Sequence, residues 1–222
     1  MVDFLLHFYR NGDRPFRSLS ALPDAKAIQF MKRLYVEGSI FWERFQDPHR
    51  YLKARRQVEQ WLRTEFIAKG GRPKDSYPIY LVLGRPKWLE TVADPATLAT
   101  TAEIQLPLSL FKEWEVSFTY PDSMVSMLLA AEKNPEYYEA GFHGKLFTLP
   151  EIRSLVESRG LPGDRWKTNI PPRLANYIEA QVWNHQVLQD YISQSSITTE
   201  RKIAMSYSSR KLSENQDVRL SL

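Results

Sequence analysis

Short runs of apolar and aromatic residues predict the strands of a buried sheet. The runs lie at residues 2–10, 77–83, 102–111, 114–120 and, as a shorter candidate, 145–148. The first run ends at Asn11-Gly12, which is a turn signal, and the second ends at Gly84. Pro107 places part of the third run at a sheet edge or in a bend, because proline cannot donate a ladder hydrogen bond.

Apolar residues at helical spacing predict amphipathic helices between these strands. The predicted helices cover residues 24–38, 48–69, 122–131 and 150–160. The second one follows Asp47-Pro48, carries an apolar stripe from Tyr51 to Phe66 and stops at Gly70-Gly71. Because strands and helices interleave, we expect an α/β or α+β fold, with a mixed central sheet flanked by helices.

Residues 174–192 fit two different structures. Their apolar positions match helical spacing, and periodicity alone favours a helix over the whole segment. The shorter run of residues 177–183 fits a strand as well. The choice matters for Glu179, which lies inside this run between apolar neighbours.

The chain is expected to form one compact domain, residues 1–192, followed by a tail. Apolar residues make up 43% and aromatic residues 13% of the 222 residues, which is a globular composition that excludes a wholly disordered or collagen-like chain. Residues 193–222 are rich in serine and poor in large apolar side chains, so we expect them to be flexible.

Several functional classes are excluded by what the sequence lacks. The absence of cysteine excludes disulfides and thiolate chemistry and agrees with a reducing compartment. The four histidines form no metal-binding pattern, so no metal site is expected, and no Walker, G-x-G-x-x-G or G-x-S-x-G motif occurs. No apolar run approaches the length of a membrane span, and Asp3 stands where a signal peptide would carry basic charge, so we expect a cytoplasmic protein.

Positive charge is concentrated between Arg44 and Lys74. This segment has nine basic and three acidic residues, an excess of six, whereas the whole chain has a net charge of +4. One interpretation is a solvated helix face, and the other is a surface that binds an anion such as a nucleic acid.

Three polar residues stand out because they lie on or beside apolar strands: His7, Tyr120 and Glu179. Each has an ordinary structural interpretation. His7 fits a hydrogen-bonded core histidine, Tyr120 a turn residue at a strand end, and Glu179 a solvated carboxylate on a helix face.

Five motifs follow one another in an order that resembles one enzyme group. They are Leu6-His7-Phe8, Leu52-Lys53-Ala54-Arg55-Arg56, Tyr77-Pro78-Ile79-Tyr80, Phe118-Thr119-Tyr120-Pro121-Asp122 and Ile178-Glu179-Ala180-Gln181-Val182. The group is the ADP-ribosyltransferase toxins that modify DNA, and the resemblance covers residues 2–192. It implies that NAD is the cosubstrate and that nucleic acid is the acceptor, which the basic segment would suit.

The resemblance also implies roles for five residues. His7 and Tyr120 would contact NAD, Arg55 or Arg56 would orient its phosphates or the acceptor, and Glu179 would stabilise positive charge at the anomeric carbon. A strand position for Glu179 beside His7 would favour this enzyme, and an exposed helical position would exclude it. The alternative is a noncatalytic binding or regulatory protein whose residues 44–74 engage nucleic acid or an acidic protein partner.

Overall fold

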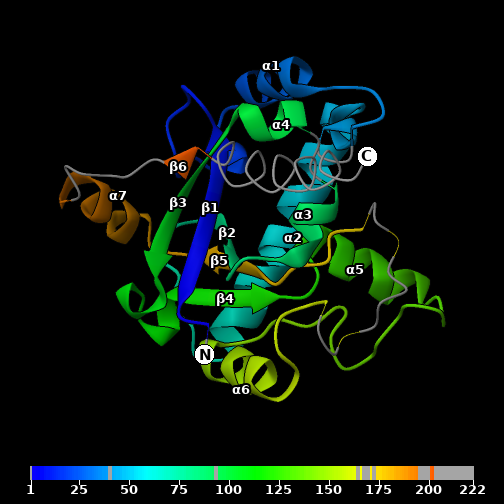
Figure 1. The fold of residues 1–222 in the computed structure, drawn as a ribbon, viewed down its shortest axis with the longest axis vertical. Coiled ribbons are helices and arrows are strands. Elements are labelled where there is room, and N and C mark those ends of the chain that lie inside the picture. Colours follow the sequence, from blue (N-terminus) through cyan, green and yellow to red (C-terminus); the bar gives the residue numbers. More distant parts are fainter. Residues whose placement is uncertain are drawn as a thin grey trace, which may run out of the picture.

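Six strands form one sheet in the order β4-β5-β2-β1-β3-β6 (Figure 1). The computed structural model describes residues 2–39, 42–92, 95–163, 166, 171, 174–194 and 201–202. The strands are β1 (Phe4–Arg10), β2 (Ile79–Leu83), β3 (Thr101–Pro107), β4 (Val116–Thr119), β5 (Glu179–Val182) and β6 (Arg201–Lys202). All five strand pairings are antiparallel, so the fold is a single α+β domain, and the expected mixture of parallel and antiparallel pairs is not observed.

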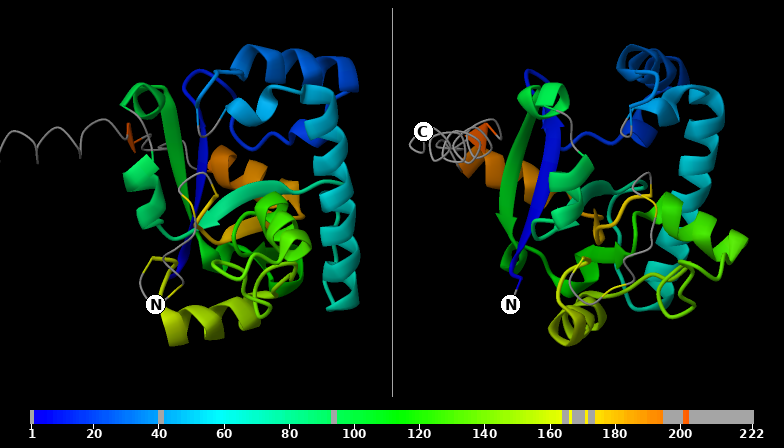
Figure 2. Two further views of the ribbon diagram at one scale, coloured as in Figure 1. Left: turned by 90° about the vertical axis from the view of Figure 1, so that its right-hand side faces the viewer. Right: turned by 45° about the vertical axis from the view of Figure 1, so that its right-hand side comes forward.

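The α-helices lie around this sheet (Figures 1 and 2). They are α1 (Asp24–Leu34), α2 (Pro48–Ala68), α3 (Lys87–Val92), α4 (Pro95–Ala99), α5 (Ser123–Glu132), α6 (Leu149–Arg159) and α7 (His185–Gln194). Short 3-10 helices cover Leu19–Ala21 (η1), Glu43–Phe45 (η2), Leu108–Leu110 (η3) and Glu113–Glu115 (η4). No helix in the described part of the chain has both the length and the apolar composition that a bilayer crossing requires.

The long helix α2 forms where the sequence predicts it. Asp47 accepts a hydrogen bond from the Arg50 amide at 3.0 Å, and Pro48 occupies the first turn, where its missing N–H costs nothing. The helix ends at Ala68, and Gly70, whose φ of 90° suits glycine, and Gly71 follow shortly after it. A Cβ atom on Gly71 would lie 2.4 Å from the Phe66 ring, so only glycine lets the chain turn back here.

The segment 174–192 is a strand followed by a helix, and the single helix that periodicity favours is wrong. Residues 179–182 pair with β2 on one side and with β4 on the other, and all four are buried. Pairing on both sides satisfies the backbone of this short strand, which local helical spacing cannot anticipate. The helical pattern continues correctly from His185 as α7.

Smaller differences concern the ends of predicted elements. The first helix ends at Leu34 and does not reach Gly38. Residues 145–148 make one isolated bridge, between Phe147 and Phe118, and no strand. Most of the predicted tail, residues 195–200 and 203–222, lies outside the described residues, and Arg201–Lys202 pair with β3.

The two faces of the sheet differ in polarity. In the strand register, Leu81, Ala180 and Phe118 lie side by side on one face, within the main apolar core that also contains Ile152 of α6 and Leu188 of α7. The opposite face carries two rows of neighbours, which are Val82, Glu179 and Thr119, and Tyr80, Gln181 and Ser117. This second set is called the polar face below.

Helix α2 runs along the polar face (Figure 2). Its lower half packs through Leu62 and Phe66 against Trp183, with the rings of Phe66 and Trp183 stacked 6.2 Å apart. One turn further toward its N-terminus, Glu59 and Arg55 face the same side of the helix. The fold therefore buries a set of polar side chains between a helix and a sheet.

Candidate active site on the polar face

Glu179 is at the centre of the polar face. Its Oε2 atom accepts hydrogen bonds from the Ser123 amide at 2.9 Å and from Gln181 Nε2 at 3.1 Å. The residue lies on β5 and is 8% exposed, so the interpretation as a solvated helix-face carboxylate is wrong. Glu179 forms no ion pair with another described residue. A buried carboxylate without such a partner is costly to maintain, which makes it a candidate for function.

A second carboxylate lies close to Glu179. Asp122 caps α5 by accepting a hydrogen bond from the Val125 amide at 2.9 Å, and Ser123 beside it donates to Glu179. Burial and the charge of Asp122 raise the pKa of Glu179 to about 7, although bonds from Ser123 and Gln181 oppose the rise. Burial also raises the pKa of Asp122. Two such acids repel each other when both are charged, which favours the protonated form of Glu179.

Arg55 supplies a fixed positive charge on the same side of α2. Its Nε atom donates to Ser20 Oγ at 3.1 Å and to Glu59 Oε1 at 3.0 Å, and its guanidinium lies 4.5 Å from the centre of the Tyr80 ring. Burial disfavours the charged form, but Tyr51, Tyr80 and Glu59 outweigh it and raise the pKa of Arg55. Among the described residues, none accepts a hydrogen bond from Arg55 Nη2.

Two tyrosines and a buried glutamate connect these charges. Tyr80 donates its hydroxyl hydrogen to Glu59 Oε1 at 3.0 Å, and Tyr80 is the register neighbour of Gln181. Burial raises the pKa of both Tyr80 and Tyr177, so both hydroxyls stay protonated at neutral pH. Glu59 is fully buried, and its Oε2 atom has no partner among the described residues. We call Arg55, Glu59, Tyr80, Asp122, Tyr177 and Glu179 the polar cluster.

His7 is not part of the polar cluster. It pairs with Ile104 of the apolar core, and strand alternation therefore places its side chain on the face opposite Glu179. Its Nε2 atom accepts from the Phe16 amide at 3.0 Å, so Nδ1 carries the hydrogen that is donated to the Tyr80 carbonyl at 3.1 Å. Burial lowers the pKa of His7 to about 4, which leaves a neutral ring with both nitrogens engaged.

Arg56 and Tyr120 also point away from Glu179. Arg56 forms an ion pair with Asp24 of α1 at 2.8 Å and donates to the Ser20 and Leu22 carbonyls. Tyr120 is completely buried, donates to Asn176 Oδ1 at 2.8 Å and packs 4.3 Å from Trp166 between ring centres. Of the five residues that the sequence singles out, Arg55 and Glu179 both lie near Tyr80, whose pKa responds to the charge of each.

Sequence reasoning did not select the partners of these two residues. Asp122 was visible as a helix cap, Glu59 stands four residues after Arg55, and Gln181 stands two residues after Glu179. A strand reading of residues 179–183 would have placed Gln181 beside Glu179. That these residues lie near Tyr80 depends on strand pairing, which no local sequence pattern indicates.

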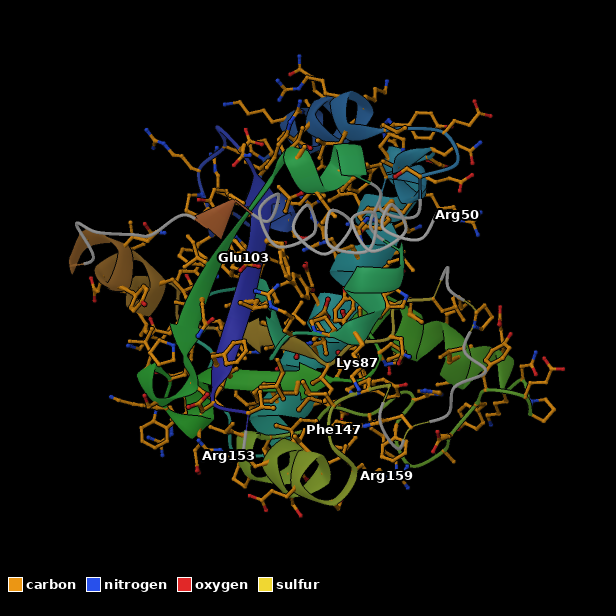
Figure 3. All side chains as sticks on the ribbon, viewed as in Figure 1. Arg50, Lys87, Glu103, Phe147, Arg153 and Arg159 are labelled. Carbon is orange, nitrogen blue, oxygen red and sulfur yellow. The ribbon has the colours of Figure 1, made fainter. Side chains whose placement is uncertain are left out.

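A groove lies on the outer side of α2, away from the polar cluster. It has a volume of about 570 Å³ and is lined by Asp24, Ile28, His49, Leu52, Lys53, Arg56, Gln57, Gln60, Arg63, Ser76 and Tyr77. Three of these side chains are Lys or Arg. Other basic residues are scattered: Figure 3 shows Arg50 near the start of α2, far from Arg153 and Arg159 on α6. We call this feature the α2 groove.

Comparisons of the chain with protein-family models, with curated proteins and with solved structures find no significant match. Within the described residues, no group of three or more His, Asp or Glu side chains is arranged to hold a metal ion.

Proposed function

We propose that the polar cluster is the active site of an enzyme that cleaves the nicotinamide–ribose bond of NAD and transfers ADP-ribose to nucleic acid. The observation that supports this proposal is the buried Glu179 carboxylate on β5, which lies beside Asp122 on the sheet face that α2 and its Arg55 cover. NAD and nucleic acid are both present in the cytoplasm, the compartment that the sequence predicts.

The reaction needs a negative charge of this kind. When the bond to nicotinamide breaks, its electron pair leaves with the nicotinamide nitrogen, and positive charge develops at the anomeric carbon of the ribose. A preorganised carboxylate at that carbon lowers the barrier, because it is already oriented before the charge forms. The nucleophilic atom of the acceptor then bonds to the same carbon and loses its proton, which a carboxylate with a pKa near neutrality can accept.

The remaining residues of the polar cluster suit the rest of the NAD molecule. Arg55 is charged at all relevant pH values and has Nη2 available, so it would bind a phosphate of NAD. Asp122 would help to keep the pKa of Glu179 near neutrality through its charge. His7 would hold β1 and β2 in place and would not touch NAD, because both ring nitrogens are engaged.

The test is nicotinamide release from NAD, measured with and without single-stranded DNA. Glu179→Gln keeps the size and the hydrogen-bond acceptor of the side chain, and we expect it to reduce release by about 100-fold or more. Thermal unfolding and circular dichroism establish that the variant is folded. If the wild type releases no nicotinamide and NAD does not change its melting temperature, the proposal is wrong.

A second candidate is noncatalytic binding of nucleic acid, and the α2 groove favours it. Lys53, Arg56 and Arg63 are placed along about 15 Å of helix, so they form a basic strip beside which a phosphate backbone could lie. Arg56 is also paired with Asp24, which leaves Lys53 and Arg63 as the cations to test. Arg50 is a matched control, because it is exposed on the same helix but does not line the groove.

Charge reversal separates this function from catalysis. Lys53→Glu and Arg63→Glu should weaken binding of single-stranded DNA about ten-fold each at low salt, and Arg50→Glu should change it little. Nicotinamide release without DNA should stay at the wild-type level in all three variants. If Arg50→Glu weakens DNA binding as much as the other two variants do, the overall charge of the protein determines binding and the groove does not. If the protein binds an acidic protein but not DNA, its partner is a protein.

A further inference from the structure

A chain of buried hydrogen bonds leads from Trp183 to Glu179. Trp183 Nε1 donates to Ser117 Oγ at 2.9 Å, and Ser117 Oγ donates to Gln181 Oε1 at 2.9 Å. Gln181 Nε2 then donates to Glu179 Oε2 at 3.1 Å and to Thr119 Oγ1 at 3.0 Å. Trp183, Ser117, Gln181 and Thr119 are all completely buried.

The direction of each bond in this chain is fixed by chemistry. An indole nitrogen can only donate, so Ser117 must accept from Trp183 and has one hydrogen left to donate. That hydrogen goes to the carbonyl oxygen of Gln181, which fixes the orientation of the amide group. Both amide hydrogens therefore point away from Ser117, one toward Thr119 and one toward Glu179.

We propose that Gln181 is a positioning residue that holds Glu179 through its Oε2 atom and directs Oε1 to the reacting centre. The proposal rests on the function proposed above for the polar cluster. The Ser123 amide and Gln181 both donate to Oε2, and the Ser123 hydroxyl also hydrogen-bonds the carboxylate. In this proposal, contact with the ribose and uptake of a proton are assigned to Oε1. Ser117 and Trp183 act one step further away, because they keep the amide of Gln181 from turning over.

A purely structural role makes a different prediction. Both roles include the hydrogen bond to Glu179 Oε2, so removing Gln181 should raise the pKa of Glu179 in either case, because this bond favours the charged form. If the chain only satisfies buried polar groups, kcat at pH values above this pKa would stay at the wild-type level. If Gln181 positions the carboxylate for the reaction, kcat would also fall there.

The experiment is a carboxyl ¹³C NMR titration of Glu179 in the full chain, with Glu179→Gln used to assign the signal. Gln181→Met keeps the length of the side chain and removes its donors, and we expect the pKa of Glu179 to rise by about one unit. Ser117→Ala frees the amide of Gln181 to turn, so it should raise this pKa by a smaller amount. Thr119→Val is the matched control, since it removes the other partner of the amide and should leave the pKa of Glu179 unchanged.

Kinetics provide the second readout. In Gln181→Met, the pH at which nicotinamide release reaches half of its maximal rate should rise with the pKa of Glu179, and kcat should fall about ten-fold while KM for NAD stays the same. An unchanged pKa of Glu179 in folded Gln181→Met would overturn the positioning role. If Gln181→Met does not fold, an unchanged pKa of Glu179 in Ser117→Ala would overturn it. A wild type that releases no nicotinamide would instead overturn the proposed function, and the titration would still decide whether Gln181 holds Glu179.

Discussion

Replacing Glu179 by glutamine should stabilise the protein at alkaline pH. In the folded chain the pKa of Glu179 is about 7, against an ordinary value of 4.5, so the folded state holds a proton that the unfolded state releases between these pH values. The stability contributed by this proton is fully present below pH 4.5 and is lost as the pH rises through 7. Glutamine carries no charge in either state, and its carbonyl oxygen can accept the bonds from Ser123 and Gln181.

The size of the effect follows from the same two pKa values. Each pKa unit corresponds to about 1.4 kcal/mol, so ionisation of Glu179 should cost the wild type roughly 2 to 3 kcal/mol between pH 5 and pH 8. Glu179→Gln should lack this dependence and gain stability relative to the wild type over that range.

Urea unfolding of both proteins at pH 5, 6, 7 and 8 measures this difference. The comparison has to be between variants, because His7 titrates with the opposite sign in part of the same range. Parallel curves of unfolding free energy against pH for the two proteins would refute the reasoning, since they would show that Glu179 ionises in the fold as it does in water.

Three further predictions concern His7, two neighbouring arginines and the packing of α2. Burial lowers the pKa of His7 to about 4, so the protonation of His7 alone should cost the wild type roughly 3 kcal/mol as the pH falls from 6.5 to 4. Because Glu179 contributes with the opposite sign, the measurement is the difference in unfolding free energy between the wild type and His7→Gln, which should shift by this amount in favour of His7→Gln over that range. Arg55→Lys should raise KM for NAD in the nicotinamide assay about ten-fold, because a lysine lacks the planar fork of donors, whereas Arg56→Lys should leave KM unchanged. Phe66→Ala should lower the unfolding free energy by about 3 to 5 kcal/mol in urea, because the stacked ring fills a fully buried space against Trp183. Equal KM values for the two arginine variants, or a loss below about 1 kcal/mol for Phe66→Ala, would contradict these assignments.

Whether an element could be predicted from the sequence depended on whether its stabilising contacts lie within one segment or come from distant segments. Helix α2 has its cap at Asp47, its apolar stripe and its stop at Gly70 within one continuous segment, so it could be predicted from the local pattern. Strand β5 has four residues, and its partners Val82 and Thr119 stand far away in the sequence. A strand of this kind gives a weak local signal, and the helical spacing of residues 174–192 therefore led to the wrong prediction of a single helix.

The same distinction applies to the polar cluster. Arg55 and Glu179 could be picked out as charged residues next to apolar stretches, and in the structure both lie near Tyr80. Their environment could not be predicted, because Asp122 reaches Glu179 only through the pairing of β4 with β5. His7 is the reverse case. It lies in an apolar strand, as the sequence indicated, but both of its ring nitrogens are hydrogen-bonded to backbone groups.

The two halves of α2 serve different purposes, and this division follows from one helical face. Positions three or four apart along that face carry Arg55 and Glu59 on the N-terminal side and Leu62 and Phe66 on the C-terminal side. The apolar half is buried against Trp183 and supplies stability, which allows the polar half to hold charges over Glu179 at a cost in free energy. Substitutions in the two halves should therefore separate: Phe66→Ala should lower stability and activity together, whereas Arg55→Lys should change binding of NAD in a protein that is still folded.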